Sequence, residues 1–192
     1  AAQLPQIARL SGLRWLRLSV AFDDAWPQDG PQLNLSGLSS LTRLSLYVSV
    51  TPYDPPVPPS QWPARTPRLV HAATCALMAA SEIPNLRRLF CSSEHEGWSS
   101  EGRIQPKDCI PVGTWGALAA VTSLAWGCGL TLSAAEMTAA VLSCTSLKLL
   151  SCAESLINRG FESPRPGVAI TFTAGSRLHA DDADDLGLAP IS

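Results

Sequence analysis

Two cysteines and one histidine bracket a polar stretch of the sequence, and these residue types could bind zinc. Cys91, His95 and Cys109 flank or lie within SSEHEGWSSEGRIQPKDC, residues 92–109. Thiolates and imidazoles are usual zinc ligands, and one further ligand would complete a tetrahedral site. The spacing is not that of a standard zinc finger, however, and Cys91 also fits the apolar pattern of the chain. We therefore expect no metal here.

A run of aspartates near the end of the chain could hold a divalent cation. The segment HADDADD, residues 179–185, contains His179, Asp181, Asp182, Asp184 and Asp185. Calcium loops alternate their oxygen ligands with a glycine at a fixed position. This run lacks that spacing, so the sequence favours a solvated acidic tail.

His71 and Cys75 lie one helical turn apart and could form a nucleophilic pair. Such a pair needs a third, orienting group and an exposed thiolate, and the packing of a helix face explains both residues without chemistry. The sequence also lacks a phosphate-binding loop, a G-x-S-x-G elbow, an H-E-x-x-H helix and the kinase signatures. It therefore predicts a protein that is not an enzyme and holds no cofactor.

The composition favours a folded chain with an ordinary core. Of its 192 residues 46% are hydrophobic and 16% charged, and the net charge is −2. A charge this small gives no general attraction to nucleic acid or anionic lipid. No apolar run approaches the ~18–20 residues that a membrane span needs. We expect neither nucleic acid nor a membrane as a partner.

Cysteine usage indicates the compartment. The chain has six cysteines with no C-x-x-C pair, and several fall at core-like positions. Buried, reduced thiols are typical of intracellular proteins. This favours a cytoplasmic protein, and association with the cytoskeleton is one form of that expectation. The glycosylation triplet Asn34-Leu35-Ser36 favours the extracellular alternative.

One apolar pattern recurs five times along the chain. Its spacing is three, three and two, which neither one helix nor one strand can hold on a single face. The pattern falls at Leu10-Leu13-Leu16-Leu18, Leu38-Leu41-Leu44-Leu46, Ile83-Leu86-Leu89-Cys91, Leu118-Val121-Leu124-Trp126 and Cys144-Leu147-Leu150-Cys152. The chain already begins inside such a pattern, at Leu4 and Ile7, so we expect a fragment of a longer protein.

The segments GLRWLRLS, SLTRLSLY, NLRRLFCS and SLKLLSCA resemble the L-x-x-L-x-L core of the leucine-rich repeat family, and AVTSLAWG does so less closely. The resemblance covers about residues 4–157. It implies an α/β fold: a curved solenoid with short parallel strands on its concave face and helices and loops on its convex face. We expect residues 1–157 to form about five irregular repeats with insertions at 51–67 and 92–113. Residues 158–192 would be a degenerate last repeat or cap with an acidic tail.

The sequence departs from that family in two respects. The family often places Asn or Cys three residues after the last leucine of the core, whereas this chain has Ala21, Ser49, Glu94, Gly129 and Ser155. The second apolar positions, at residues 13, 41, 86, 121 and 147, are separated by steps of 28, 45, 35 and 26, and family repeats usually span about 20–29 residues. Two units therefore carry insertions.

Local signals place the helices and a last strand. Ser133 and Glu136 form a capping-box pattern before an alanine-rich run, which predicts a helix over 133–143. Thr66 and Pro67 predict a helix start, with the helix continuing to residue 80. The segment GVAITFTAG, residues 167–175, could form the last strand.

Residues that alternate with the strand leucines would point away from the core, onto the concave face. In the first three units these positions carry arginine and aromatic side chains, which are enriched at interface hot spots. The predicted protein-binding residues are Trp15, Arg17, Arg43, Tyr47, Arg88 and Phe90. They suit a partner protein with an acidic or mixed surface. The alternative is that these arginines only keep the sheet soluble.

The function that follows is a non-catalytic protein–protein interaction module: a scaffold, adaptor or recognition arm. One alternative is the ligand-sensing ectodomain of an extracellular or membrane leucine-rich repeat receptor. Another is the recognition part of a larger enzyme complex such as a ubiquitin ligase. Fold alone does not choose among these functions.

Overall fold

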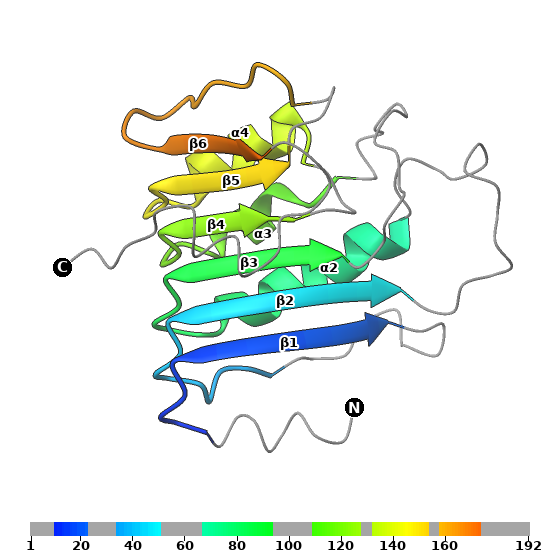
Figure 1. Ribbon diagram of the computed structural model, residues 1–192, viewed down its shortest axis with the longest axis vertical. Coiled ribbons are helices and arrows are strands. Elements are labelled where there is room, and N and C mark those ends of the chain that lie inside the picture. Colours follow the sequence, from blue (N-terminus) through cyan, green and yellow to red (C-terminus); the bar gives the residue numbers. More distant parts are fainter. Residues whose placement is uncertain are drawn as a thin grey trace, which may run out of the picture.

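The computed structural model describes residues 10–22, 34–50, 67–93, 109–127, 132–153 and 158–173. These residues form an α/β structure with a parallel sheet, which confirms the predicted class (Figure 1). The strands are β1 (Trp15–Phe22), β2 (Arg43–Val50), β3 (Arg88–Ser93), β4 (Ser123–Trp126), β5 (Leu149–Ala153) and β6 (Ala169–Thr173). The helices are α2 (Pro67–Ser81), α3 (Val112–Gly116) and α4 (Ala134–Ser143).

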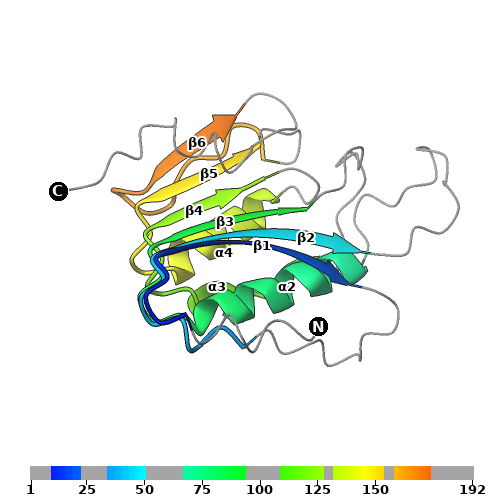
Figure 2. The ribbon, with the colours of Figure 1, turned by 60° about the horizontal axis from the view of Figure 1, so that its bottom comes forward.

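The sheet has the simplest parallel order, in which each strand pairs with the next strand of the sequence, from β1 to β6. The described helices all lie against one face of the sheet, so the opposite face carries no described element (Figure 2). Neighbouring parallel strands must be joined by a crossover connection. In this sheet the described crossovers all lie on the face that the helices cover. We call the two sides of the sheet the helix face and the open face.

The leucine pattern becomes two apolar rows on the helix face. Neighbouring strands pair in register, so equivalent residues of successive units stand side by side. One row is Leu16-Leu44-Leu89-Leu124-Leu150-Ile170, and the other is Leu18-Leu46-Cys91-Trp126-Cys152-Phe172. From β2 to β5 both rows are buried. They pack with α2 and α4 side chains such as Leu77 and Met137 in one core.

The steps of three that precede each strand are hydrogen-bonded turns. The N–H of Leu38 donates to the carbonyl of Leu35, and the N–H of Leu41 to that of Leu38, both at 3.0 Å. The same bonds recur before β3, β4 and β5. Each turn reverses the chain direction over three residues and places an apolar side chain at its corner. The three leucines at these corners, Leu35, Leu38 and Leu41, are fully buried. The change from steps of three to steps of two therefore marks the passage from turns into a strand.

The first unit differs from the others in burial. Leu10 is 53% exposed and Leu13, Leu16 and Leu18 are only partly buried, whereas Leu44 and Leu46 are fully buried. The reason is geometric, because β1 is an edge strand with a described neighbour on one side only.

The helices follow their local signals. Helix α4 begins with the predicted capping box, in which the Ser133 hydroxyl accepts a hydrogen bond from the Glu136 N–H and the Glu136 carboxylate accepts one from the Ser133 N–H. Helix α2 begins at Pro67, as predicted, while Thr66 lies outside the described residues. The short α3 was not predicted. Within the described ranges, none of the helices combines the length and the apolar character that crossing a membrane requires.

The last strand is also confirmed, since β6 spans residues 169–173 and pairs with β5. A buried asparagine supports the approach to it. The Asn158 side chain is 1% exposed and donates hydrogen bonds to the carbonyls of Leu132 and Ala153, at 3.2 and 3.1 Å. It thereby joins the loop before β6 to the ends of β5 and α4. No pattern in the sequence pointed to this residue.

Candidate functional site

The six predicted binding residues come together on the open face. Register places Trp15, Arg43 and Arg88 side by side at the start of β1, β2 and β3. Two residues further along, Arg17 and Phe90 flank Ser45, and Tyr47 follows on β2. We call these six residues the arginine–aromatic patch: Trp15, Arg17, Arg43, Tyr47, Arg88 and Phe90.

The patch is held together by contacts between charge and ring. The guanidinium carbon of Arg17 lies 4.5 Å from the centre of the Tyr47 ring, and that of Arg43 lies 5.1 Å from the centre of the Trp15 ring. Both distances are within the range of cation–π attraction. The Tyr47 and Phe90 rings are 5.5 Å apart and tilted by 52°. The side chains are thus ordered before any partner arrives.

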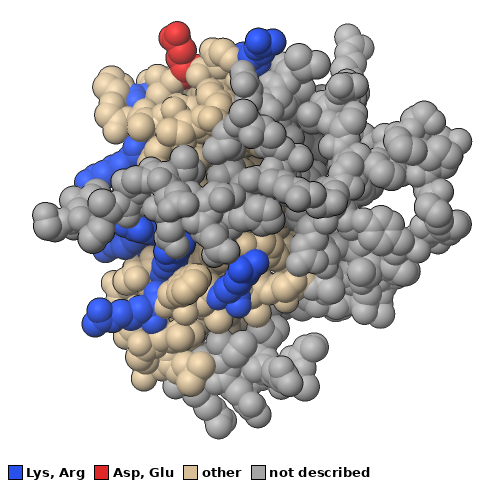
Figure 3. All heavy atoms as spheres, viewed as in Figure 1, with Lys and Arg blue, Asp and Glu red and all other residues tan. Residues whose placement is uncertain are grey.

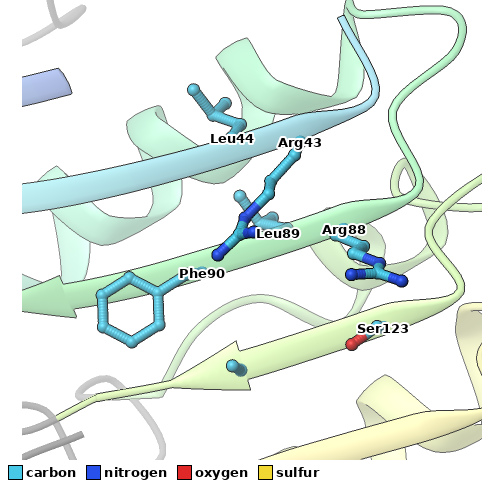
Figure 4. Close-up of a pocket in the computed structure, with 7 residues that line it drawn as sticks. Arg43, Leu44, Arg88, Leu89, Phe90 and Ser123 are labelled. Carbon is cyan, nitrogen blue, oxygen red and sulfur yellow. The ribbon is translucent and has the colours of Figure 1, made fainter. Parts of the chain in front are cut away.

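A shallow pocket lies over β3, with β2 and β4 on either side of it. Its lining includes Arg43, Arg88, Phe90, Ser123 and Ala125. Figure 4 shows the Arg43 guanidinium reaching across β3 between Phe90 and Arg88, with Arg88 directed toward Ser123 on β4. Phe90 and Ala125, each 5% exposed, form a small apolar cluster with Tyr47, separate from the main core. The pocket therefore has an apolar floor and two cationic walls.

Exposure is graded across the patch. Trp15, on the edge strand, is 50% exposed and Arg17 is exposed, while Arg43, Tyr47 and Arg88 are half-buried and Phe90 is buried. Arginine and aromatic hot-spot residues usually lie near the buried centre of an interface, which is where Phe90, Arg43, Tyr47 and Arg88 lie within this patch.

The charge of the described residues is strongly one-sided. They hold nine of the fourteen basic residues and three of the sixteen acidic ones. Of those three, Glu136 is buried in the α4 cap, and Glu82 and Glu162 lie outside the strands. Figure 3 shows basic side chains gathered where the strands begin, with an acidic group only at the top of the view. Of the described residues on the strands, Arg17, Arg43 and Arg88 are the charged ones, so the described part of the open face carries positive charge only.

The other half of the open face is built from small residues. Ser123, Ala125 and Gly127 on β4 and just after it, and Ser151 on β5, continue the rows of the patch, and all four are buried. Gly127 is required by a close approach, because a Cβ there would lie 2.8 Å from the Cβ of Ser92. We call the residues Ser123, Ala125, Gly127 and Ser151 the small-residue patch.

Buried hydroxyls on this face lack partners. The hydroxyl oxygens of Ser45, Tyr47, Ser151 and Thr171 are inaccessible and make no hydrogen bond. A buried polar group without a partner costs about 1–3 kcal/mol, so such groups are rare in folded proteins. Here they gather on one face of one sheet.

The cysteines of the core are unsuited to nucleophilic chemistry. Burial raises the pKa of the Cys91 and Cys152 thiols to about 12 and that of Cys144 to about 11. His71 Nε2 and Cys75 Sγ lie 3.6 Å apart, as their spacing predicts. Burial raises the pKa of the Cys75 thiol as well, which disfavours the thiolate that a nucleophile requires.

The predicted metal candidates fall only partly within the structure. Cys91 is a core residue, 2% exposed, and Cys109 is half-buried, while His95 lies outside the described residues. The aspartates of the 179–185 segment also lie outside them. Within the described part of the chain, no three His, Cys, Asp or Glu residues are grouped as metal ligands.

Comparison of the chain with protein-family models, curated proteins and solved structures found no match. Any assignment to a family or a function therefore depends on the residues and geometry described above.

Proposed function

We propose that this chain is a solenoid of the leucine-rich repeat type that acts as a non-catalytic protein-interaction module. Its binding surface is the open face of the sheet, centred on the arginine–aromatic patch, and its partner is a protein with an acidic surface. The observation that carries the proposal is the alignment of Arg43 with Arg88 over the buried Phe90.

The repeat assignment is supported by the recurrence of one local structure. Turns followed by a short strand recur from β2 to β5, the described return segments α2, α3 and α4 lie on the helix face (Figure 2), and each strand pairs with the next in register. A carbonyl just before each of β1, β2, β3 and β4 accepts bonds from two N–H groups of the following unit, as Thr42 does from Arg87 and Arg88. In a solenoid, each repeat can bury its apolar side chains only by stacking against the neighbouring repeats.

The binding proposal is supported by the positive charge of the arginines and by their stacking on aromatic rings. Arg43 and Arg88 are register neighbours on strands about 4.8 Å apart. One carboxylate of a partner protein that reaches both guanidinium groups would form charge-assisted hydrogen bonds with each. Because Arg17 and Arg43 are already stacked on rings, binding would cost little further side-chain entropy.

A cytoplasmic setting is supported by the described cysteines. Cys75, Cys91, Cys109, Cys144 and Cys152 are thiols that form no disulfide, which suits a reducing compartment. The triplet Asn34-Leu35-Ser36 has a structural explanation: the Asn34 side chain accepts bonds from the Ser36 N–H and hydroxyl, and Leu35 is buried in the core.

The test compares reversal of the patch charges with reversal of charges elsewhere. One variant carries Arg17→Glu, Arg43→Glu and Arg88→Glu. The control carries Arg14→Glu, Lys148→Glu and Arg159→Glu, which change the same charge at exposed residues outside the patch. Both are used as bait in quantitative affinity purification, after circular dichroism has verified folding, and interactors are identified by mass spectrometry.

The proposal predicts a set of acidic proteins that the wild-type chain and the control recover and the patch variant does not. Equal recovery by all three baits, with folding intact, would exclude the patch as the binding surface.

A further inference from the structure

The pocket over β3 brings two arginines and a hydroxyl to one small opening. Register pairs Arg43 with Arg88 and Arg88 with Ser123, so these side chains come from three neighbouring strands at one level of the sheet. All three line the pocket, and Figure 4 shows the Arg88 side chain directed toward Ser123. None of the described residues that line it is acidic. The opening therefore offers hydrogen-bond donors and positive charge to a ligand.

The number and charge of these donors exceed what a single carboxylate accepts. Each guanidinium presents several N–H donors in a planar fork, and the serine hydroxyl adds one O–H donor. A carboxylate has two oxygens and one negative charge, whereas a phosphate monoester has three accepting oxygens and a charge of about −1.5 to −2 at neutral pH. Arginine forks also match the geometry of phosphate. The donor set thus favours a phosphate over a carboxylate.

Arg43 is held in place before a ligand arrives. Its guanidinium carbon lies 5.1 Å from the centre of the Trp15 ring. Stacking uses the flat face of a guanidinium, whereas its N–H donors lie in the plane of the group. An anion can therefore bind at the edge of the Arg43 guanidinium while the ring contact persists, and the side chain loses little further entropy on binding.

The small size of the pocket limits what can enter it. Its volume is about 20 Å³, which is enough for one water-sized group. Its lining includes Phe90 and Ala125, whose side chains carry no polar atom. One oxygen of a phosphate fits in this space, but the ring of a phosphotyrosine does not. The pocket therefore suits a phosphate carried on a short side chain.

We infer that the pocket binds a phosphorylated serine or threonine of the partner protein. The phosphate lies between Arg43 and Arg88, and one of its oxygens accepts a hydrogen bond from the Ser123 hydroxyl. This inference rests on the proposed function, because it specifies the acidic group that the partner presents to the arginine–aromatic patch. Its consequence is that phosphorylation of the partner controls binding.

The test titrates the full chain with short peptides that differ at one position. Each peptide is a run of glycines around a single phosphoserine, serine, glutamate or phosphotyrosine. Binding is followed by nuclear magnetic resonance through the arginine Nε–Hε signals of the isotope-labelled protein, and the backbone amide spectrum verifies that each variant is folded. The Kd of each peptide is taken from the shifts.

Four variants locate the binding. Arg88→Gln removes one guanidinium, Arg88→Lys keeps its charge without the fork, and Ser123→Ala removes only the hydroxyl. Arg17→Gln is the matched control, since it removes the same charge from the arginine–aromatic patch at a residue that does not line the pocket.

The phosphoserine peptide should bind about tenfold more tightly than the glutamate peptide, and the serine peptide should cause no shift. Arg88→Gln should weaken phosphoserine binding by about tenfold or more, because charge-assisted hydrogen bonds are lost. Arg88→Lys should also weaken it, since an ammonium lacks the fork. Ser123→Ala should weaken it about threefold. Arg17→Gln should change it by less than about twofold, because exposed charges outside the site act only through screened attraction.

Several outcomes would overturn the inference. Equal affinity for the phosphoserine and glutamate peptides would exclude a phosphate site, as would the absence of any shift with phosphoserine. An equal loss in Arg88→Gln and Arg17→Gln would reduce the effect to general charge. Tighter binding of the phosphotyrosine peptide would exclude the short side chain as the ligand.

The inference and the proposed function fail in different ways. Phosphatase treatment of the lysate should abolish recovery of the partners that depend on the patch. Recovery that survives this treatment would contradict the phosphate site and leave the binding proposal intact. Equal recovery by the wild-type, control and patch-variant baits would contradict the binding proposal, and the peptide titration would still report whether the pocket takes a phosphate.

Discussion

The two faces of the sheet are made by the same strands, yet they carry different kinds of side chain. In β2, Leu44 and Leu46 point to the helix face, where every unit supplies apolar side chains. Arg43, Ser45 and Tyr47 point to the open face, where the side chains change from arginine and aromatic on β1–β3 to small ones on β4 and β5, with Leu149 as the exception. Successive side chains alternate between faces, so one strand serves both purposes.

The difference separates stability from recognition. The helix face is a continuous apolar core whose rows are repeated from unit to unit, so its energy comes from burial. The open face carries charge, stacked rings and unpartnered hydroxyls, which contribute little to stability and give the surface its chemical character. For two adjacent residues of one strand, a substitution on the helix face should therefore lower stability, and a substitution on the open face should mainly change binding.

The largest effect is expected for Leu44→Ala on the helix face. Leu44 is fully buried, and deleting such a side chain costs about 2–5 kcal/mol of unfolding free energy. Its neighbour provides the contrast: Ser45→Ala removes a buried, unpartnered hydroxyl and should leave the protein as stable as the wild type or more so. Urea denaturation measures both. A comparable loss in the two variants would break the distinction between the faces.

A smaller loss is expected for Gly127→Ala on the open face. The added Cβ would lie 2.6 Å from the Ser92 Oγ and 2.8 Å from its Cβ, and overpacking of this kind costs about 1–3 kcal/mol. The double variant with Ser92→Gly removes the clash and should recover part of that loss, which a double-mutant cycle in urea would measure. Additive losses would show that Ser92 is not the obstacle.

The buried thiol at Cys91 predicts a loss of stability in alkali. Burial raises its pKa to about 12 from the ordinary thiol value of 9.0, so above pH 9 the unfolded chain releases a proton that the folded chain retains. The free energy of unfolding should therefore fall by about 1.4 kcal/mol for each pH unit between 9 and 12 through this group. Cys91→Ala should have a shallower slope in urea titrations under reducing conditions. Equal slopes would contradict the assignment.

The smallest effect concerns the stacked cations. Arg17→Ala removes the cation–π contact with Tyr47 and should cost about 0.5–1 kcal/mol of stability. Arg14→Ala removes a similar exposed charge from the residue before β1 and serves as the control. If thermal unfolding shows the same loss of stability in both variants, the stack of Arg17 on Tyr47 adds no stability, and the arginines act only as surface charge.

Much of the helix face could be predicted from the sequence. The steps of two identify strands, the steps of three identify turns, and the capping box at Ser133 marks the start of α4. Each of these depends on contacts between residues close in sequence, so local spacing contains the information. The same reasoning placed Arg43 and Arg88 on one face, since equivalent positions of successive units pair in register.

Long-range features could not be predicted in this way. Asn158 bridges to Leu132 and Ala153, and Glu136 accepts a bond from the Ile110 N–H at 2.9 Å in addition to its capping bonds. Position on the open face was predicted correctly for Phe90, but its burial was not, because burial depends on Tyr47 from the neighbouring unit and on Ala125 from the next.

Turn and strand spacings are local, so the order of residues within each unit indicates which side chains that unit offers to each face. The alignment of the units arises only in the folded sheet, and it sets which cations lie side by side, which buried hydroxyls make no hydrogen bond and where a glycine is needed. Alignment depends on hydrogen bonds between units, such as those from Arg87 and Arg88 to Thr42. These bonds join residues separated by tens of positions, and no spacing within one unit encodes them.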